Sequence, residues 1–130
     1  MSILVFLTLI QMKIKKAIFP GSFDPFTKGH EYVIQKSLDV FDEVIIGIGV
    51  NTSKQYLFDL EKRIAHIQEI YKNNDRVTVM TYEGLTTDFC SKVGGSHIVR
   101  GLRNSIDFEY EKAIAEMNFM MDKIETVFFM

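Results

Sequence analysis

The chain has 130 residues, of which 47% are hydrophobic and 25% are charged, and its formal net charge at pH 7 is −2. This length and composition are ordinary for one soluble globular domain with a buried core. The net charge excludes a basic surface that would recruit nucleic acid, so any polyphosphate site must be a local cluster of positive groups. The single cysteine, Cys90, excludes an internal disulfide and a cysteine-rich metal site, and it fits a reducing compartment.

An apolar run opens the chain at residues 3–10 (ILVFLTLI). It is shorter than the ~20 residues that span a bilayer, and it lacks the basic flank and the cleavage site of a secretory signal. The first lysines and the first predicted strand follow Met12. We therefore predict an apolar extension at residues 1–12, outside the core, and a domain over residues 13–130. A membrane-directing role and an added edge strand are the alternatives for the extension.

The first part of the domain alternates between strand and helix patterns. Residues 17–19 form a short apolar strand, and residues 31–41 form a helix with apolar side chains at positions i, i+4 and i+7. Residues 44–50 (VIIGIGV) are almost continuously apolar, which is typical of a parallel strand covered on both faces.

A polar loop at residues 51–58 leads to a second helix, which Asp59 can cap. The inner face of this helix repeats apolar residues at helical spacing: Leu60, Ile64, Ile67 and Tyr71. Residues 77–82 are rich in β-branched side chains and form the third predicted strand.

The last part of the chain continues the alternation. Thr86 or Thr87 begins a short helix that ends at the helix-stopping pair Gly94 and Gly95. A strand, the longest helix and a final strand follow at residues 97–100, 107–121 and 126–130. The longest helix carries large apolar side chains on one face: Tyr110, Ile114, Met117 and Met121.

This order of elements predicts an α/β fold. Because crossovers between parallel strands are right-handed, the pattern predicts a Rossmann-like open parallel five-stranded sheet with helices on both faces. Ligands of such sheets bind at the carboxyl ends of the strands, near the point where the strand order reverses.

The segment at residues 21–30 (GSFDPFTKGH) is the most informative part of the chain. A glycine-opened loop between a strand and a helix is where α/β proteins hold phosphates. His30 falls on the first turn of the helix, where an imidazole donor suits charge on a phosphoryl oxygen. The Ser22 hydroxyl is a second candidate phosphate ligand, although a turn-forming serine is the alternative, and Asp24 is expected to shape the turn.

Cationic side chains also follow the other predicted strands. Lys54 comes after the second strand, and Arg100 and Arg103 flank Gly101 at the end of the fourth. Arginine at the carboxyl ends of parallel strands suits bidentate phosphate binding. The alternative is that these lysine and arginine side chains are solvated surface cations. Glu111, in the first turns of the longest helix, is either a partner of the helix dipole or part of the site.

Other motifs are absent from the sequence. There is no GxxxxGK[ST] P-loop, and the Gly47 and Gly49 pair lies inside a strand, so it is not a dinucleotide fingerprint. His66 and His97 have no ligand-like neighbours. No cluster has metal-ligand spacing, so we expect no metal ligands, and a divalent ion would arrive with a nucleotide.

These motifs together resemble the phosphopantetheine adenylyltransferases of the bacterial coenzyme A pathway. The resemblance rests on PGSFDPFTKGH at 20–30, Lys54, IVRGLRNSIDFEYE at 98–111 and MN at 117–118. The HxGH motif of the superfamily is TKGH in this chain, with Thr27 in place of the first histidine, which is the form seen in this family.

The resemblance implies that ATP and 4′-phosphopantetheine give dephospho-coenzyme A and pyrophosphate, with Mg²⁺, by in-line attack without a covalent intermediate. It implies three sets of site residues. The catalytic set is His30, Lys54 and Arg103. The ATP-binding set is Ser22, Phe23, His30, Gly101, Leu102, Arg103 and Glu111. The substrate-binding set is Ser22, Lys54, Thr86 and Arg100. It also implies a cytoplasmic homo-oligomer, hexameric in the family, with no nucleic-acid or membrane partner.

The family's pattern continues past the fifth strand with a serine-rich loop and helices that add ATP contacts, whereas this sequence ends at residue 130. We therefore expect residues 13–130 to be a nucleotidyltransferase domain without that segment. An inactive or weak nucleotide-binding fragment is the alternative function. Another small-substrate nucleotidyltransferase, using nicotinamide mononucleotide or a cytidylyl donor, is a third reading, and the RGLR–DFEYE block argues against it.

Overall fold

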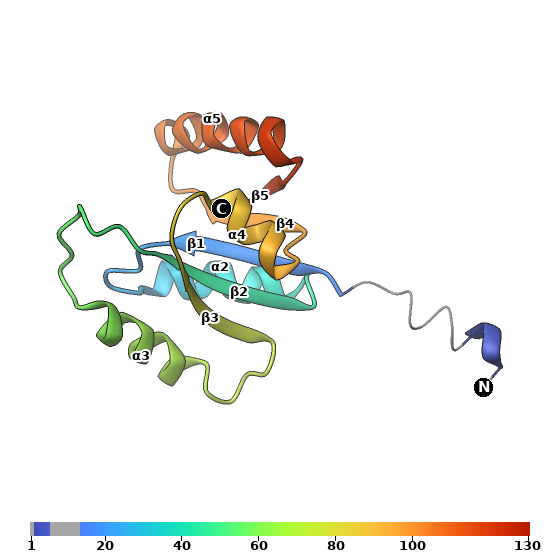
Figure 1. The fold of residues 1–130 in the computed structure, drawn as a ribbon. Helices are drawn as coiled ribbons and strands as arrows, with labels where there is room; N and C mark the ends of the chain where they lie inside the picture. The colour runs from blue at the N-terminus through green and yellow to red at the C-terminus, as the bar shows by residue number, and fades with distance from the viewer. Residues whose placement is uncertain (1, 6–13) are drawn as a thin grey trace.

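The computed structural model describes residues 2–5 and 14–130. Figure 1 shows a single twisted sheet with helices above and below it. The elements, in chain order, are β1 (Lys16–Gly21), α2 (Lys28–Leu38), β2 (Glu43–Gly49), α3 (Leu60–Ile70), β3 (Val77–Tyr82), α4 (Thr86–Val93), β4 (His97–Gly101), α5 (Ser105–Asp122) and β5 (Glu125–Phe129). The predicted extension at residues 1–12 lies mostly outside the described residues and stays a prediction.

All five strands are parallel, in the order β3-β2-β1-β4-β5. The chain runs outward from β1 through β2 to β3 and then returns to the other side of β1 for β4 and β5. The order therefore reverses between β1 and β4, which creates a crevice at their carboxyl ends. The predicted fold class is confirmed.

Two hydrophobic clusters hold the layers together, one on each face of the sheet. On one face, alternate side chains of β1 and β2 pack against α2 and α3, with Ile34 and Ile67 fully buried. On the other face, Ile18 and Ile98 pack against Phe89 and Cys90 of α4. The β-strands are thus covered on both sides, as the continuous apolar run of β2 predicts.

One helix start and one helix cap differ from the sequence-based prediction, and one helix end agrees with it. Helix α2 begins at Lys28 rather than residue 31, because Thr27 caps it and starts the hydrogen bonding three residues earlier. Asp59 occupies the N-cap position of α3, but its side chain makes no capping hydrogen bond. The glycine stop of α4 is confirmed, since Gly94 adopts a left-handed conformation with φ of 73°.

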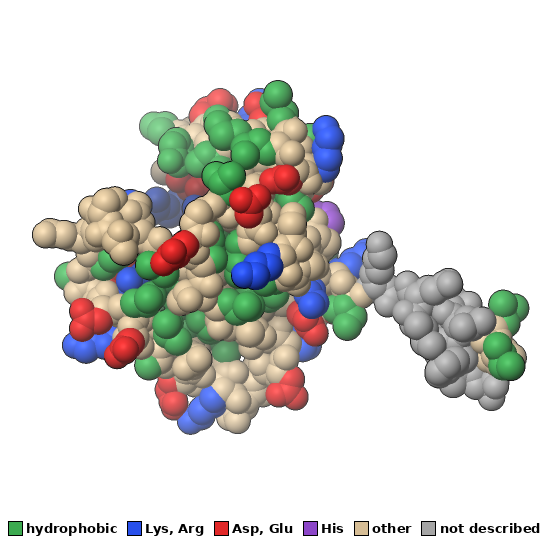
Figure 2. Space-filling view, viewed as in Figure 1, with side chains coloured by type: hydrophobic (Ala, Val, Ile, Leu, Met, Phe, Trp, Pro, Cys, Tyr) green, Lys and Arg blue, Asp and Glu red, His purple; other side chains and the backbone are tan. Residues whose placement is uncertain are grey.

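Helix α5 carries the predicted apolar face, but this face is not part of the core. Only Glu111 of this helix is buried. Figure 2 shows hydrophobic side chains gathered over this helix. The large apolar side chains of α5 that are exposed are Ile106, Tyr110, Ile114, Met117, Phe119, Met120 and Met121. Within the described residues, no helix combines the length and the apolar character needed to cross a bilayer.

Candidate functional site

Three adjoining pockets lie at the carboxyl ends of the strands. The His30 pocket, of about 350 Å³, lies between α2 and the segment that joins β4 to α5. The Thr86 pocket, of about 260 Å³, shares Arg100 and Glu111 with it. The Lys54 pocket, of about 510 Å³, shares Gly21 and Tyr82 with the Thr86 pocket. The three pockets thus form one continuous row along the predicted ligand edge.

The start of α2 places His30. Thr27 is the N-cap residue, and the backbone N–H of Thr27 donates to Nδ1 of His30 at 2.9 Å, while Thr27 Oγ1 accepts from the His30 backbone N–H. This reciprocal pair is a capping box in which histidine takes the place usually held by Glu or Gln. The sequence predicts His30 as a candidate site residue, but no motif in it predicts that Thr27 orients the ring.

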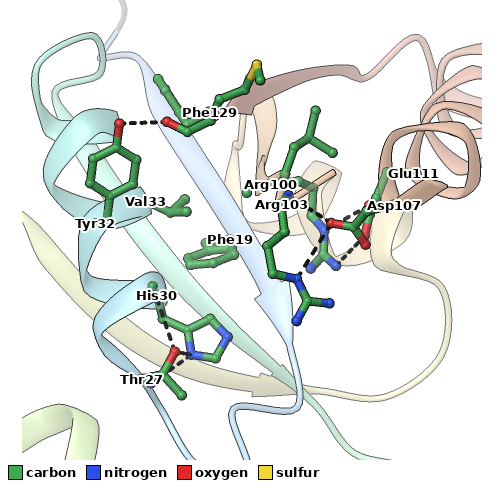
Figure 3. A pocket seen from close by; sticks show the side chains of 14 residues that line it. Phe19, Thr27, His30, Tyr32, Val33, Arg100, Arg103, Asp107, Glu111 and Phe129 are labelled. Carbon is green, nitrogen blue, oxygen red and sulfur yellow. Dashed lines mark hydrogen bonds and ion pairs between the residues drawn. The ribbon is translucent and has the colours of Figure 1, made fainter. Parts of the chain in front are cut away.

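The hydrogen bond to Nδ1 also decides which ring nitrogen carries the proton. Because Nδ1 accepts the Thr27 N–H, the proton of a neutral ring lies on Nε2, which points away from Thr27 (Figure 3). Burial, and secondly the nearby charge of Arg100, lower the pKa of His30 below 6.5. Phe19, Phe23 and Phe26 surround the ring with centroids 5.0–5.8 Å away, which explains the burial. At neutral pH, His30 is therefore a neutral donor.

Acidification should destabilise the fold through His30. The unfolded chain binds the proton near pH 6.5, whereas the folded chain binds it only at lower pH. The stabilisation is therefore full above pH 6.5 and is lost as the pH falls through the folded pKa. Glutamine at position 30 keeps the capping box but does not titrate. We expect the Tm of the wild type to fall more than that of His30→Gln between about pH 7.5 and 5.5; parallel Tm profiles would contradict this.

Arg100 lines the His30 pocket, and Figure 3 shows its guanidinium beside Glu111. Its Nε and one terminal nitrogen donate to the two carboxylate oxygens of Glu111 at 3.0 and 2.7 Å, and its other terminal nitrogen donates to the Pro20 carbonyl at 2.6 Å. Glu111 is buried, so this bidentate pair fixes the guanidinium plane. The structure thus places Glu111 as the partner of Arg100, on the wall between two pockets. Its predicted role in binding ATP stays a prediction.

The RGLR segment (residues 100–103) lines the His30 pocket, and its predicted role in binding ATP stays a prediction. Gly101 is required there because a Cβ would lie 2.9 Å from Cγ2 of Val33, so only glycine lets β4 approach α2 this closely. Leu102 donates its backbone N–H to the Phe129 carbonyl at 2.8 Å. The side chain of Arg103 is 87% exposed, with a long 3.9 Å contact to Asp107, so its guanidinium is available to a ligand.

Lys54 and Ser22 both line the Lys54 pocket, and their predicted role in binding the substrate phosphate stays a prediction. Asn51 shapes this loop, since its side-chain oxygen accepts from the Ser53 backbone and hydroxyl at 3.0 and 2.6 Å, and its carbonyl accepts from the Lys54 N–H at 3.1 Å. Lys54 and Ser22 are both exposed. Together they offer an ammonium and a hydroxyl to an anion.

Phe23 and Ser22 do not line the His30 pocket with the other predicted ATP ligands. The Phe23 side chain is buried in the core at 3% exposure, so any contact with a ligand must come from its backbone. Its φ of 50° is unusual for a residue other than glycine. The buried ring holds the backbone in this conformation.

Tyr82 also belongs to the candidate site, although no sequence motif predicted it. It lies at the end of β3, stacks on Phe89 with centroids 4.5 Å apart, and shares a 2.9 Å hydrogen bond with the Thr86 hydroxyl. It lines both the Thr86 and the Lys54 pockets. Burial raises the pKa of Tyr82, so it stays a neutral hydrogen-bonding group. Its place at the carboxyl end of a strand was the available signal.

The described residues offer no group of three or more His, Cys, Asp or Glu side chains that could hold a metal ion. The carboxylates of the His30 pocket are already engaged, Glu111 by Arg100 and Asp107 by the Arg103 backbone N–H at 3.2 Å. These residues therefore do not fit a resident Mg²⁺ site.

Comparison with known proteins agrees with this geometry. Residues 18–130 match the family described as cytidylyltransferase-like. A phosphopantetheine adenylyltransferase from Flavobacterium psychrophilum is 56% identical over 114 residues, which cover 88% of this chain and 76% of the relative. The protein of the same name from Flavobacterium johnsoniae is 55% identical, with 88% of this chain and 75% of the relative covered.

Solved structures agree on the fold. A lipopolysaccharide core biosynthesis protein from Thermoplasma volcanium superposes with a TM-score of 0.64 and covers 91% of this chain and 98% of its own. Its sequence identity of 22% supports the fold alone. The identity to the Flavobacterium proteins is far higher and extends over 88% of this chain. The chain therefore belongs to the phosphopantetheine adenylyltransferase family, within the cytidylyltransferase-like proteins.

Proposed function

We propose that this protein transfers the adenylyl group of ATP to 4′-phosphopantetheine, giving dephospho-coenzyme A and pyrophosphate. The placement of the candidate residues in adjoining pockets supports the proposal independently of the family name. His30, Arg100 and Arg103 line one pocket, Lys54 and Ser22 line another, and Arg100 joins the row between them. Two anionic substrates can therefore meet at the strand-order reversal, with cationic or donor groups on each side.

The pockets divide the substrates between them. ATP occupies the His30 pocket, with its phosphates toward His30 and Arg103 and its nucleoside along Gly101 and Leu102. The 4′-phosphate of the acceptor lies between Lys54, Ser22 and Arg100. The pantetheine arm extends along Thr86 in the adjoining pocket.

The reaction then needs positioning and charge stabilisation. A phosphate oxygen of the acceptor is already ionised and attacks the α-phosphorus of ATP in line; the bond from this phosphorus to the bridging oxygen breaks, and pyrophosphate leaves. No general base is required, which agrees with the engagement of both Glu111 oxygens by Arg100. His30 Nε2–H donates to the α-phosphoryl oxygen as charge gathers there. The cationic side chains hold both reactants in line.

Magnesium belongs to the proposal only as a companion of the nucleotide. The ion would enter on the ATP phosphates with most of its waters retained, since the described residues do not build a site for it. Omitting Mg²⁺ from the assay tests this. ATP and the single reduced cysteine also favour the cytoplasm as the location.

A homo-oligomer assembled through α5 is the second part of the proposal. Members of the family are expected to be hexamers, and α5 presents a continuous apolar face to solvent. We expect Met117→Lys combined with Met121→Lys to lower the mass measured by sedimentation equilibrium to that of a monomer. Val40 matches Met117 at 60% exposure but belongs to the turn between α2 and β2, so Val40→Lys should leave the mass unchanged. A monomeric wild type would refute the assembly.

Pyrophosphate release from the purified chain, with ATP, Mg²⁺ or 4′-phosphopantetheine omitted in turn, tests the reaction. Release that requires all three supports adenylyl transfer. Binding of ATP without release would favour the alternative of a weak nucleotide-binding fragment. Release with nicotinamide mononucleotide in place of 4′-phosphopantetheine would indicate a different acceptor.

A further inference from the structure

Arg63 is a charged residue in the interior, outside the predicted site. It lies on α3, and only 5% of its surface is exposed. One terminal nitrogen donates to the Ser22 carbonyl at 2.8 Å, and Nε donates to the Phe58 carbonyl at 3.0 Å. The Tyr56 ring covers the guanidinium at 4.2 Å. Arg63 thus bridges the loop that follows β1 and the loop that precedes α3.

Asp24 forms a second link between the same two loops. One carboxylate oxygen accepts the Phe58 backbone N–H at 2.7 Å, and the other accepts the Leu57 backbone N–H. In the described part of the chain, Arg63 makes no ion pair with a carboxylate. Its charge is therefore balanced by carbonyl groups and an aromatic face, and its hydrogen bonds serve to join loops. We call Arg63 and Asp24 the loop clamp.

The loop clamp connects the two sides of the Lys54 pocket. One loop carries Ser22, and the other carries Lys54; both residues line this pocket. The Ser22 carbonyl is turned toward Arg63, so the N–H on the other side of this trans peptide, that of Phe23, points the opposite way. Among the described residues, that N–H makes no hydrogen bond. The clamp therefore sets both the spacing of the loops and the direction of a free donor.

We propose that Arg63 and Asp24 are positioning residues for the phosphate of the acceptor substrate. This inference rests on the proposed function. Loss of the loop clamp lets the Ser22 loop and the Lys54 loop move apart. This weakens the binding of the phosphate but leaves the contacts that the protein makes with the pantetheine arm. A lysine cannot replace Arg63, because only the planar guanidinium donates from two edges while stacking on Tyr56.

The experiment compares two arginines that both donate to loop carbonyls. Arg76 donates to the carbonyls of Leu38, Phe41 and Asp42 at the opposite edge of the sheet, away from the pockets. We expect Arg63→Met to weaken the binding of 4′-phosphopantetheine about tenfold by calorimetry, the loss of one charge-assisted hydrogen bond. Pantetheine, which lacks the phosphate, should bind Arg63→Met as it binds the wild type. Arg76→Met should bind both ligands like the wild type.

A second variant covers the case in which Arg63→Met does not fold. Asp24→Asn keeps the shape of the side chain but leaves one acceptor oxygen for two backbone N–H groups. We expect the same selective loss, smaller in size. Equal losses for both ligands, or no loss, would overturn the clamp and leave the proposed function standing. Failure of the wild type to bind 4′-phosphopantetheine would overturn the proposed function and the clamp together.

Discussion

His30→Ala should lower turnover by about 10²–10³-fold, the loss expected when one preorganised charge-stabilising donor is removed. The reason lies in the geometry of the ring. The Thr27 N–H fixes Nδ1 as an acceptor, so the ring proton lies on Nε2, on the side of the pocket. Burial keeps the pKa of His30 below its usual value. Steady-state pyrophosphate release measures the loss, which should fall on kcat more than on KM for ATP.

Two further variants separate this role from the capping role of the same side chain. His30→Gln keeps the capping box and should restore the Tm lost in His30→Ala. Its flexible amide, held at Thr27 through the oxygen, lacks the rigid ring that directs Nε2–H into the pocket, so turnover should stay low. His66→Ala removes an exposed imidazole from α3, outside the His30 pocket, and should leave turnover unchanged. Recovery of wild-type turnover in His30→Gln would show that His30 serves the helix alone.

Arg100→Met should abolish measurable adenylyl transfer and also destabilise the fold by about 3 kcal/mol, because it leaves the Glu111 carboxylate buried without a partner. Arg103→Met is the matched control for stability. It removes the same side chain from the same pocket, but Arg103 is exposed and makes only a long contact to Asp107. Its free energy of unfolding should change by less than about 0.5 kcal/mol. Urea denaturation measures both changes.

The double variant Arg100→Met with Glu111→Leu distinguishes the two effects of Arg100. Replacing both members of a buried pair with apolar side chains should recover most of the stability. Turnover should not recover, because the cation that we propose to bind the acceptor phosphate is still absent. Activity that returns with stability would mean that Arg100 acts on the fold and does not contact the substrate.

The order of strands and helices, and much of the site, followed from the amino-acid sequence because these features depend on short-range patterns. Alternating apolar runs predicted all five strands, and the glycine pair at Gly94 predicted the end of α4. His30 could be recognised because the strand, the loop and the helix that build its surroundings are neighbours in the chain. The RGLR segment could be recognised for the same reason, since Arg100, Gly101 and Arg103 lie together at the end of one strand.

Long-range pairing decided the remainder. How the crossovers stack the layers decides three features of the structure. These are the Arg100–Glu111 ion pair, the contact between Arg63 and Ser22 across 41 residues of sequence, and the exposure of the apolar face of α5. No periodicity distinguishes an arginine that binds a phosphate from one that joins two loops, because both lie on helices or loops with polar neighbours. The sequence by itself determined the fold class and located the segments that we propose to bind phosphate, because both depend on short-range patterns. The tertiary structure alone decided which charges are buried, what each one contacts, and where the three pockets adjoin.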